Sequence, residues 1–193
     1  MHPSYVDLRA LLRKSVTTLY ADLVTRPTGR AVRVGIEQQL ASLSSPCVSV
    51  IDFSQVGILD FSCADEIVAR LLLQYRRPDR PADTFFFLRG LAEHHREPIE
   101  CVLDRHGLLL GAQTRAGERW LLGPTEEAVR DLWRALEAIG RGTAVRLARE
   151  LQMGDDVAVA GLAQLAGQRA AVAGPDWEFL ALGALVHAGE PPA

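Results

Sequence analysis

Residues 50–69, VIDFSQVGILDFSCADEIVA, lead from a strand into a helix through two similar segments, IDFS and LDFS. Just before them, CVSVIDF at 47–53 is apolar and rich in β-branched residues, which predicts a strand covered on both faces. From Ser62 onward, apolar residues recur at helical spacing, namely Ala64, Ile67, Val68, Leu71 and Leu72. We therefore expect Asp52 at the end of a strand and Asp60 just before a helix.

The chain around this unit alternates between predicted helices and strands. Amphipathic helices are expected over residues 6–20 and 27–43. A second buried strand, DTFFFLRGL at 83–91, precedes a helix whose regular part opens at Pro98 and ends at Gly107. The segments LLLGAQT and ERWLLG then form a hairpin through RAG. This order predicts an α/β fold with a parallel sheet and helices packed on it.

The pattern changes after Gly123. TEEAVRDLWRALEAIG predicts a helix with a threonine cap at its start and Gly140 beyond its end. GTAVRLARELQMG and DDVAVAGLAQLAGQRA predict two further helices, and AVAGPDWEFLAL predicts two strands around a Gly-Pro-Asp turn. Three helices followed by a hairpin is the order of a small α+β winged helix. The expected divisions of the chain are a first domain at 1–115, a connection at 116–123, a second domain at 124–183 and a tail at 184–193.

Composition narrows the class of protein. A formal net charge of −3 over 193 residues gives no general attraction to nucleic acid or anionic membranes. The cysteines Cys47, Cys63 and Cys101 are odd in number and widely spaced, which fits reduced cytosolic thiols and indicates no metal site. No apolar run approaches the roughly 18 residues of a membrane helix, and the N-terminus lacks the order of a signal peptide. We expect a cytoplasmic protein without membrane partner, metal or cofactor.

DFSQVGILDFS resembles the pattern of STAS domains, the fold of anti-sigma factor antagonists. In that pattern a strand ends in Asp, a short hydrophobic loop follows, and a second Asp eight residues on precedes a modifiable serine. Asp52 and Asp60 have this spacing, and the phosphorylated position of the antagonists corresponds to Ser62. The sequence departs from the pattern at Phe61, where a first hydroxyl is usual, and at Cys63, where glycine is usual.

The resemblance covers residues 20–113, because FFFLRGLAEHHREPIECVLDRHGL also resembles the end of a STAS domain. With a helix before the first core strand, the chain looks most like STAS-like domains of unknown function that accompany a histidine-kinase-type ATPase. The resemblance implies a non-enzymatic bacterial signalling protein that binds such an ATPase or a sigma-regulatory protein and is phosphorylated at Ser62. The residues expected at the partner-binding surface are Asp52, Asp60, Phe61, Cys63 and Asp65.

Two other interpretations of the motif stay open. Ser62 and Asp65 also have the spacing of a capping box, in which the Ser62 hydroxyl would only cap a helix. Asp52 and Asp60 could instead be paired catalytic carboxylates, or Cys63 a thiol activated by a helix N-terminus. No glycine-rich phosphate loop, metal-spaced histidine pair or identifiable base accompanies them in the sequence, so we expect no catalytic residue.

Two charged stretches are ambiguous. Glu93, His94, His95 and Glu97 suggest a metal site, but adjacent histidines on a helix point about 100° apart, and a solvated helix start is the simpler interpretation. RRPDRP at 76–81 is a basic loop that could meet phosphate or an acidic partner, or could simply be a solvated linker.

LWRALEAIGRGTAVRLARELQMGDDVAVAGLAQLAGQRAAV resembles winged helix-turn-helix domains. DNA-binding versions read the major groove with the second helix of the turn, here about 155–168. That helix begins with Asp155 and Asp156, which complement phosphate poorly, so protein contact or homodimerisation is favoured. The alternative is a DNA-binding transcription regulator with the STAS-like domain as sensor. Its DNA contacts would be Arg141, Arg146, Arg149, Gln164, Gln168 and Arg169.

Overall fold

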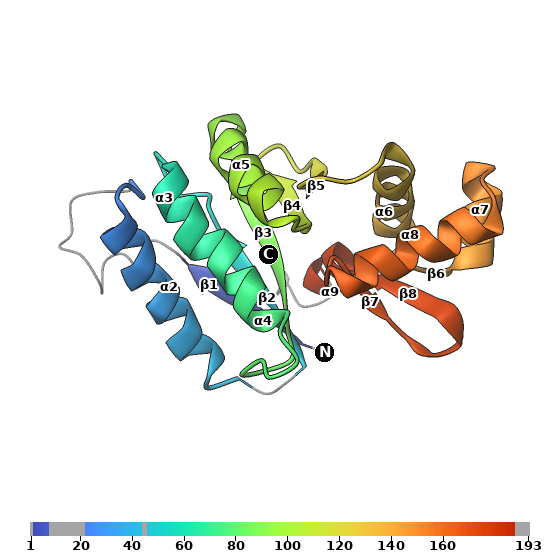
Figure 1. The fold of residues 1–193 in the computed structure, drawn as a ribbon, viewed down its shortest axis with the longest axis horizontal. Coiled ribbons are helices and arrows are strands. Elements are labelled where there is room, and N and C mark those ends of the chain that lie inside the picture. Colours follow the sequence, from blue (N-terminus) through green and yellow to red (C-terminus); the bar gives the residue numbers. More distant parts are fainter. Residues whose placement is uncertain (1, 8–21, 44–45, 188–193) are drawn as a thin grey trace.

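The computed structural model describes residues 2–7, 22–43 and 46–187 (Figure 1). Its main sheet has the order β1-β2-β3-β4-β5, in which β1 to β4 are parallel and β5 runs antiparallel to β4. The strands are β1 (His2–Asp7), β2 (Cys47–Asp52), β3 (Thr84–Leu91), β4 (Leu110–Thr114) and β5 (Arg119–Leu122). A small antiparallel sheet has the order β6-β8-β7. The coarse prediction of an α/β protein is confirmed, with a mixed main sheet whose first four strands are parallel and a small antiparallel sheet after it.

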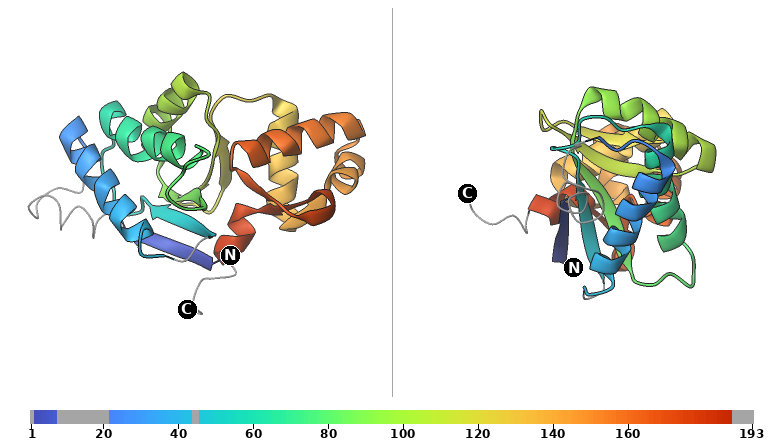
Figure 2. Two further views of the ribbon diagram at one scale, coloured as in Figure 1. Left: turned by 60° about the horizontal axis from the view of Figure 1, so that its bottom comes forward. Right: turned by 90° about the vertical axis from the view of Figure 1, so that its left-hand side faces the viewer.

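Helices α2 (Arg26–Leu40), α3 (Phe61–Ala64), α4 (Arg70–Tyr75) and α5 (Arg96–His106) cover one face of the main sheet (Figures 1 and 2). A π-helical turn, η1 (Asp65–Ala69), joins α3 to α4 without a break, and a 3-10 turn, η2 (Glu93–His95), precedes α5. One hydrophobic cluster unites these helices with Ile51, Phe86 and Leu88 of the sheet. This face places the start of α3 beside the end of β2.

The C-terminal half of the chain packs on the opposite face. It consists of α6 (Glu127–Ile139), β6 (Arg141–Thr143), α7 (Ala144–Leu151), α8 (Asp155–Gly167), β7 (Ala171–Ala173), the 3-10 turn η3 (Pro175–Trp177), β8 (Glu178–Ala181) and α9 (Leu182–His187). Val48, Val50, Phe85 and Phe87 share one buried cluster with Trp133 and other residues of this half. Alternate residues of β2 and β3 therefore serve the two faces, as strand geometry requires.

The end of α8 is tied to the main sheet by polar contacts. Arg169 Nη2 lies 2.6 Å from Asp83 Oδ1 and donates to the Thr84 carbonyl at 3.0 Å. The same guanidinium lies 3.9 Å from the centre of the Phe85 ring, a cation–π distance. Gln168 Nε2 donates to the Gly107 carbonyl at 3.1 Å. The domain boundaries drawn from the sequence at 115 and 124 stay a prediction. Residues from both sides of these boundaries pack into one hydrophobic cluster on this face of the sheet.

The first predicted helix was placed wrongly at its start. Residues 6 and 7 belong to β1, and the rest of the 6–20 prediction lies outside the described residues. Among the strands that the structure describes, β1 stands at the edge of the sheet and pairs with β2. Pro3 is compatible with this place, because an edge strand has one side without ladder hydrogen bonds. The six residues of this strand carry too little pattern to separate it from an amphipathic helix.

Other boundaries also differ from the sequence-based expectation, among them that of α2, expected at 27–43. The helix of the opening motif begins at Phe61, one residue earlier than expected. The prediction of a threonine cap for α6 is wrong, because Glu126 occupies the cap position and makes no side-chain cap hydrogen bond. The Thr125 hydroxyl instead accepts a hydrogen bond from Gln164 Nε2 at 3.2 Å. Within the described residues, no helix combines the length and the apolar character that crossing a bilayer requires.

Two glycines with positive φ differ in their surroundings. Gly107 ends α5 at φ 60°, as the sequence predicted, and a Cβ added there would meet nothing within 4 Å. Gly90, in β3, has φ 70°, and an added Cβ would lie 2.7 Å from the backbone nitrogen of Ser54. Gly90 thus lets β3 approach the loop that follows β2.

Gly90→Ala should destabilise the fold more than Gly107→Ala. We expect Gly107→Ala to lose about 1 kcal/mol, because alanine disfavours a left-handed backbone. Gly90→Ala should lose about 2–4 kcal/mol, because the added methyl also collides with the Ser54 backbone. Urea denaturation of both variants measures the difference, and equal losses would show that the Ser54 loop yields freely.

Candidate functional site

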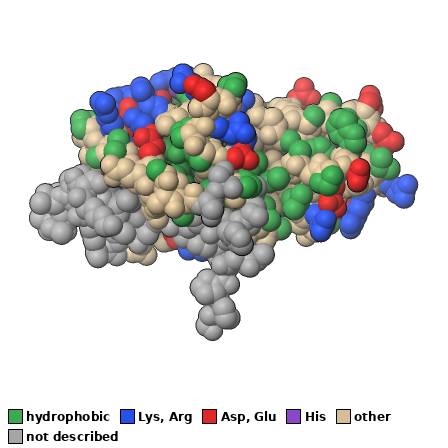
Figure 3. Space-filling view, turned by 90° about the horizontal axis from the view of Figure 1, so that it is seen from below, with side chains coloured by type: hydrophobic (Ala, Val, Ile, Leu, Met, Phe, Trp, Pro, Cys, Tyr) green, Lys and Arg blue, Asp and Glu red, His purple; other side chains and the backbone are tan. Residues whose placement is uncertain are grey.

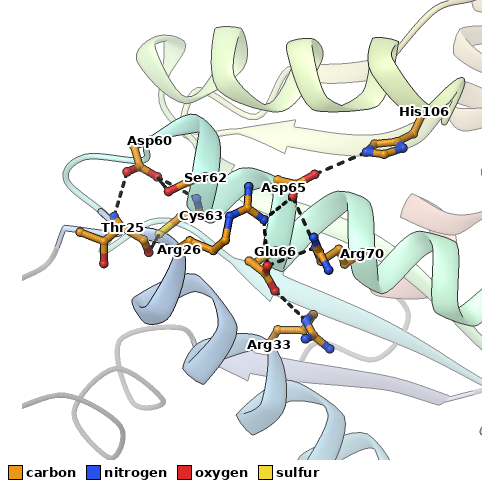
Figure 4. A network of polar contacts seen from close by, with 10 residues as sticks. All are labelled: Thr25, Arg26, Arg33, Asp60, Ser62, Cys63, Asp65, Glu66, Arg70 and His106. Carbon is orange, nitrogen blue, oxygen red and sulfur yellow. Dashed lines mark hydrogen bonds and ion pairs between the residues drawn. The ribbon is translucent and has the colours of Figure 1, made fainter.

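Asp60 joins three parts of the chain at the start of α3 (Figure 4). Its Oδ1 accepts from the Cys63 backbone N–H at 2.7 Å and from the Ser62 hydroxyl at 2.9 Å. Its Oδ2 accepts from the Thr25 backbone N–H at 2.8 Å, which ties in the segment before α2. Asp60 is therefore the cap of α3. The interpretation of Ser62 and Asp65 as a capping box is wrong, because Ser62 is already inside the helix and donates its hydroxyl proton to Asp60.

The segment before α2 runs parallel to the end of the loop after β2 and pairs with it as a short strand would. Leu23 and Leu59 form an isolated parallel bridge, with Leu23 N–H donating to the Ile58 carbonyl at 2.7 Å and Asp60 N–H to the Leu23 carbonyl at 3.0 Å. Thr25 closes this pairing with φ 74°, a backbone conformation that costs energy for a β-branched residue. The Asp60 bond to Thr25 N–H holds the strained residue in place.

Cys63 is buried and faces this junction. Its thiol donates to the Thr25 carbonyl at 3.0 Å. Burial raises the pKa of the Cys63 thiol to about 12, and the negative charge of Asp60 acts in the same direction. The thiol is therefore protonated at neutral pH. The alternative of a thiol activated by a helix N-terminus is not supported, since the Asp60 carboxylate occupies that helix terminus.

Exposed apolar residues occur in the segments that meet at the start of α3. The Ser62 side chain is partly buried, and its neighbour Phe61 is 49% exposed. Ile58, 54% exposed, precedes the bridge residue Leu59, and Val24, 39% exposed, follows the other bridge residue. Val24, Ile58 and Phe61, which we call the apolar rim, thus belong to the two segments that Asp60 holds together.

Asp52 has partners of its own. Its Oδ2 accepts from Arg89 Nη2 at 2.8 Å, and its Oδ1 accepts from the Ser54 backbone N–H at 2.8 Å. Arg89 is its register neighbour on β3. Burial acts to raise the pKa of Asp52, but the Arg89 and Ser54 hydrogen bonds outweigh it and hold that pKa below its usual value. Asp52 thus binds β3 to the loop, while Asp60 binds the loop to α3.

Two histidines between β3 and α5, together with Arg115 after β4, hold the middle of the loop that follows β2. His94 Nε2 and His95 Nε2 lie 2.7 Å and 3.2 Å from the Gly57 carbonyl. Arg115 Nη2 donates to the Val56 carbonyl at 3.1 Å. His95 is fully buried, and its Nδ1 accepts from the Ala92 N–H at 3.2 Å, so Nε2 carries the proton given to Gly57. The expectation of a solvated helix start is wrong for His95 and holds for the exposed His94.

The π-helical turn η1 buries two adjacent carboxylates, Asp65 and Glu66, whose side chains are 9% and 4% exposed. Arg26 Nη1 lies 2.7 Å from Asp65 and 3.0 Å from Glu66, so one guanidinium serves both (Figure 4). Burial acts to raise the pKa of Asp65, but hydrogen bonds from Arg26, Arg70 and His106 outweigh it and lower that pKa. Such burial is tolerable only because each charge is paired.

Two further arginines complete this network. Arg70 Nε lies 3.1 Å from Glu66 Oε1 and 3.4 Å from Asp65 Oδ2. Arg33 Nε lies 3.3 Å from Glu66 Oε2, and its Nη1 lies 2.5 Å from Glu37. The network joins α2 to the helix of the opening motif. Sequence reasoning assigned Asp65 to the partner surface and missed the network, because its members come from positions about 40 residues apart.

The residues assigned to DNA contact are mostly engaged within the chain. Arg141 pairs with Glu178 at 2.7 Å, Gln164 bonds to Thr125, and Arg169 and Gln168 hold α8 to the main sheet. Arg146 and Arg149 are exposed on α7. The solvent-facing positions of α8 carry no basic side chain. These positions are Asp155, Asp156, Val157, Ala160, Ala163, Gln164 and Gly167.

Within the described residues, no group of three or more histidine, cysteine, aspartate and glutamate side chains is arranged to hold a metal ion. Comparison with protein-family models finds no model that matches the chain, and comparison with curated proteins finds no significant similarity. The function must therefore be inferred from the geometry of the chain itself.

Asp60→Ala should destabilise the protein more than Ser62→Ala. The first change removes the acceptor of three hydrogen bonds and the helix cap, and we expect a loss of about 1–2 kcal/mol or more. The second removes one partly exposed bond, worth about 0.5–1 kcal/mol. Asp60→Asn keeps an acceptor oxygen and serves as the matched control. If urea denaturation showed a larger loss of unfolding free energy for Ser62→Ala, Ser62 rather than Asp60 would be the cap of the helix.

His95 should make the fold sensitive to mild acid. Burial lowers the pKa of His95 below its usual value of 6.5. Above about pH 6.5 the ring is neutral in both states, and below it the unfolded chain binds a proton that the folded chain resists. Stability should therefore fall as pH drops from 6.5, by at most about 1.4 kcal/mol per pH unit.

The matched measurement compares the protein with His95→Gln by urea denaturation at several values between pH 7.5 and 5. The variant should be less stable at neutral pH, because the bonds to Gly57 and Ala92 are weakened, but its stability should depend less on pH. Parallel curves would show that His95 does not resist protonation in the folded state.

Proposed function

We propose that this chain is a non-enzymatic, cytoplasmic regulatory protein that acts by switchable protein binding, with Ser62 as the modified residue. The observation that carries the proposal is the Ser62 hydroxyl, which lies partly exposed at the helix start that Asp60 joins to the segments of the apolar rim, Val24, Ile58 and Phe61. The partner we propose is a histidine-kinase-type ATPase or a related sigma-regulatory protein. The resemblance of the Asp52 to Ser62 motif to that of anti-sigma factor antagonists supports this choice.

The apolar rim is suited to contact with a protein. Apolar side chains that gather on one surface mark interaction sites more often than single exposed ones do. The three side chains of the rim stand on backbone that is fixed by the Leu23–Leu59 bridge and by the Asp60 carboxylate. A partner would therefore bind a preformed surface and would lose little entropy in ordering it.

Phosphorylation at Ser62 would change this surface directly. A kinase would transfer the γ-phosphoryl group of ATP to Ser62 Oγ, releasing ADP and the hydroxyl proton. The product has lost the proton that Ser62 donates to Asp60, and it carries a charge of about −2 beside that carboxylate. Repulsion would strain the contacts of Asp60 with Thr25 and Cys63, and the rim would become strongly anionic.

The fold we propose for the two halves follows the same resemblance. The parallel strands β1 to β4 with α2 to α5 on one face support a STAS-like first domain, within residues 1–115. Helices α6 to α8 and the β7–β8 hairpin support a winged-helix-like second domain at 124–183. The acidic start of α8 and the engagement of Arg169 and Gln168 with the main sheet favour protein contact or homodimerisation over DNA binding for this part.

Ser62→Asp should weaken partner binding, whereas Ser62→Ala should preserve it. With the full-length protein as bait in a lysate of its own cells, quantitative mass spectrometry should find an ATPase of the histidine-kinase type on the native protein. We expect that protein to be depleted at least about tenfold on Ser62→Asp, because a charge placed at the rim costs more than about 1.4 kcal/mol of binding free energy.

Ser42→Asp is the matched control, because Ser42 is exposed just beyond the end of α2 that lies away from Thr25 and Asp60, and it receives the same added charge. It should bind the partner as the native protein does. Equal loss on Ser42→Asp and Ser62→Asp, or no loss on either, would contradict a switch at Ser62. Mapping of phosphorylated residues in the purified native protein gives an independent check.

A further inference from the structure

A second candidate site lies between α2 and α4, on the helix-covered face of the main sheet. It is a cavity of about 410 Å³ whose lining includes the side chains of Arg33, Arg70 and Arg77. Figure 3, seen from below, shows basic side chains gathered with a few acidic ones on the half of the molecule that carries the main sheet. A cavity of this size falls in the range of small-molecule sites.

The three guanidinium groups keep donors for a ligand. Arg70 reaches Glu66 and Asp65 through Nε, and no bond to a described residue involves its two terminal nitrogens. Arg33 uses Nε and Nη1, which leaves Nη2. The Arg77 side chain makes no ion pair or hydrogen bond with any residue that the structure describes. Each guanidinium has five N–H donors, so several remain for an anion.

The carboxylates also hold two of these arginines in place. Glu66 forms ion pairs with both Arg33 and Arg70, and Glu37 forms a second ion pair with Arg33. Arginines that are already oriented lose little side-chain entropy when an anion binds. A guanidinium group can donate two parallel hydrogen bonds to two oxygens of a phosphate group. A halide ion offers no such pair of acceptors, so the arginines favour phosphate.

The rest of the lining favours an organic group attached to the phosphate. Leu73, 38% exposed, and Pro81 provide apolar surface, and Gln74 provides an amide. Asp79 is the acidic residue of the lining and opposes a second negative group. We propose that this cavity binds a small phosphate monoester, with its phosphate on Arg33, Arg70 and Arg77 and its organic group against Leu73 and Pro81. The site does not depend on modification of Ser62.

The test is titration calorimetry of the full-length protein with phenyl phosphate, inorganic phosphate and phenol in a low-chloride buffer. We expect saturable binding of phenyl phosphate, weaker binding of inorganic phosphate and none of phenol. Arg77→Gln should weaken both phosphates at least about tenfold, as expected for loss of charge-assisted hydrogen bonds. Because the Arg77 side chain has no described partner, this change should leave the unfolding temperature within the error of measurement.

Arg76→Gln is the matched control, since it removes the same charge from the neighbouring position, which is not among the lining residues. It should change binding less than about threefold, as expected for a screened surface charge. Leu73→Ser should remove the preference for phenyl phosphate over inorganic phosphate, and Asp79→Asn should tighten both.

Several outcomes would overturn the proposal. They are the absence of saturable binding, equal weakening by Arg76→Gln and Arg77→Gln, and binding of inorganic phosphate as tight as that of phenyl phosphate. Adsorption to phosphatidylglycerol vesicles that both substitutions weaken equally, without binding of phenyl phosphate, would also overturn it, because it would reveal only a diffuse basic surface.

Discussion

The central strands β2 and β3 carry apolar side chains on both faces, and a parallel sheet of this kind must be shielded from water on both sides. Ile51 and Leu88 face the helices α2 to α5, whereas Val50 and Phe87 face the C-terminal half. Covering both faces brings the two halves of the chain into contact through the sheet. Arg169 and Gln168 then hold α8 to strand β3 and the end of α5.

The carboxyl ends of these strands are where the candidate site forms. Asp52, Gly90 and His95 fix the loop after β2 from the side of β3, and Asp60 fixes its other end to α3 and to Thr25. The loop is therefore held from both ends. Its apolar rim is exposed and the Ser62 hydroxyl partly exposed on this doubly held backbone, a suitable arrangement for a surface that one modification would alter. The Asp65–Glu66 network continues from this backbone toward the arginine-lined cavity.

Much of the fold was predictable because its elements carry local signals. The apolar runs 47–53 and 83–91 predicted β2 and β3, and Gly107 and Gly140 ended their helices as expected. Strand β1 was missed, because a short strand carries too few residues for its pattern to differ clearly from that of an amphipathic helix. The cap of α6 was also missed, since Thr125 has a partner on α8 that is remote in sequence.

The sequence by itself determined the order of strands and helices from α2 to α6 and the placing of Asp60 and Ser62 at the start of a helix, because spacing and side-chain type act over a few residues. Only the tertiary structure decided what these groups do there. It gave the cap to Asp60, buried His95, raised the pKa of Cys63 and paired Asp65 and Glu66 with arginines of α2 and α4. Each of these outcomes depends on burial and on partners distant along the chain, and local spacing carries no information about either.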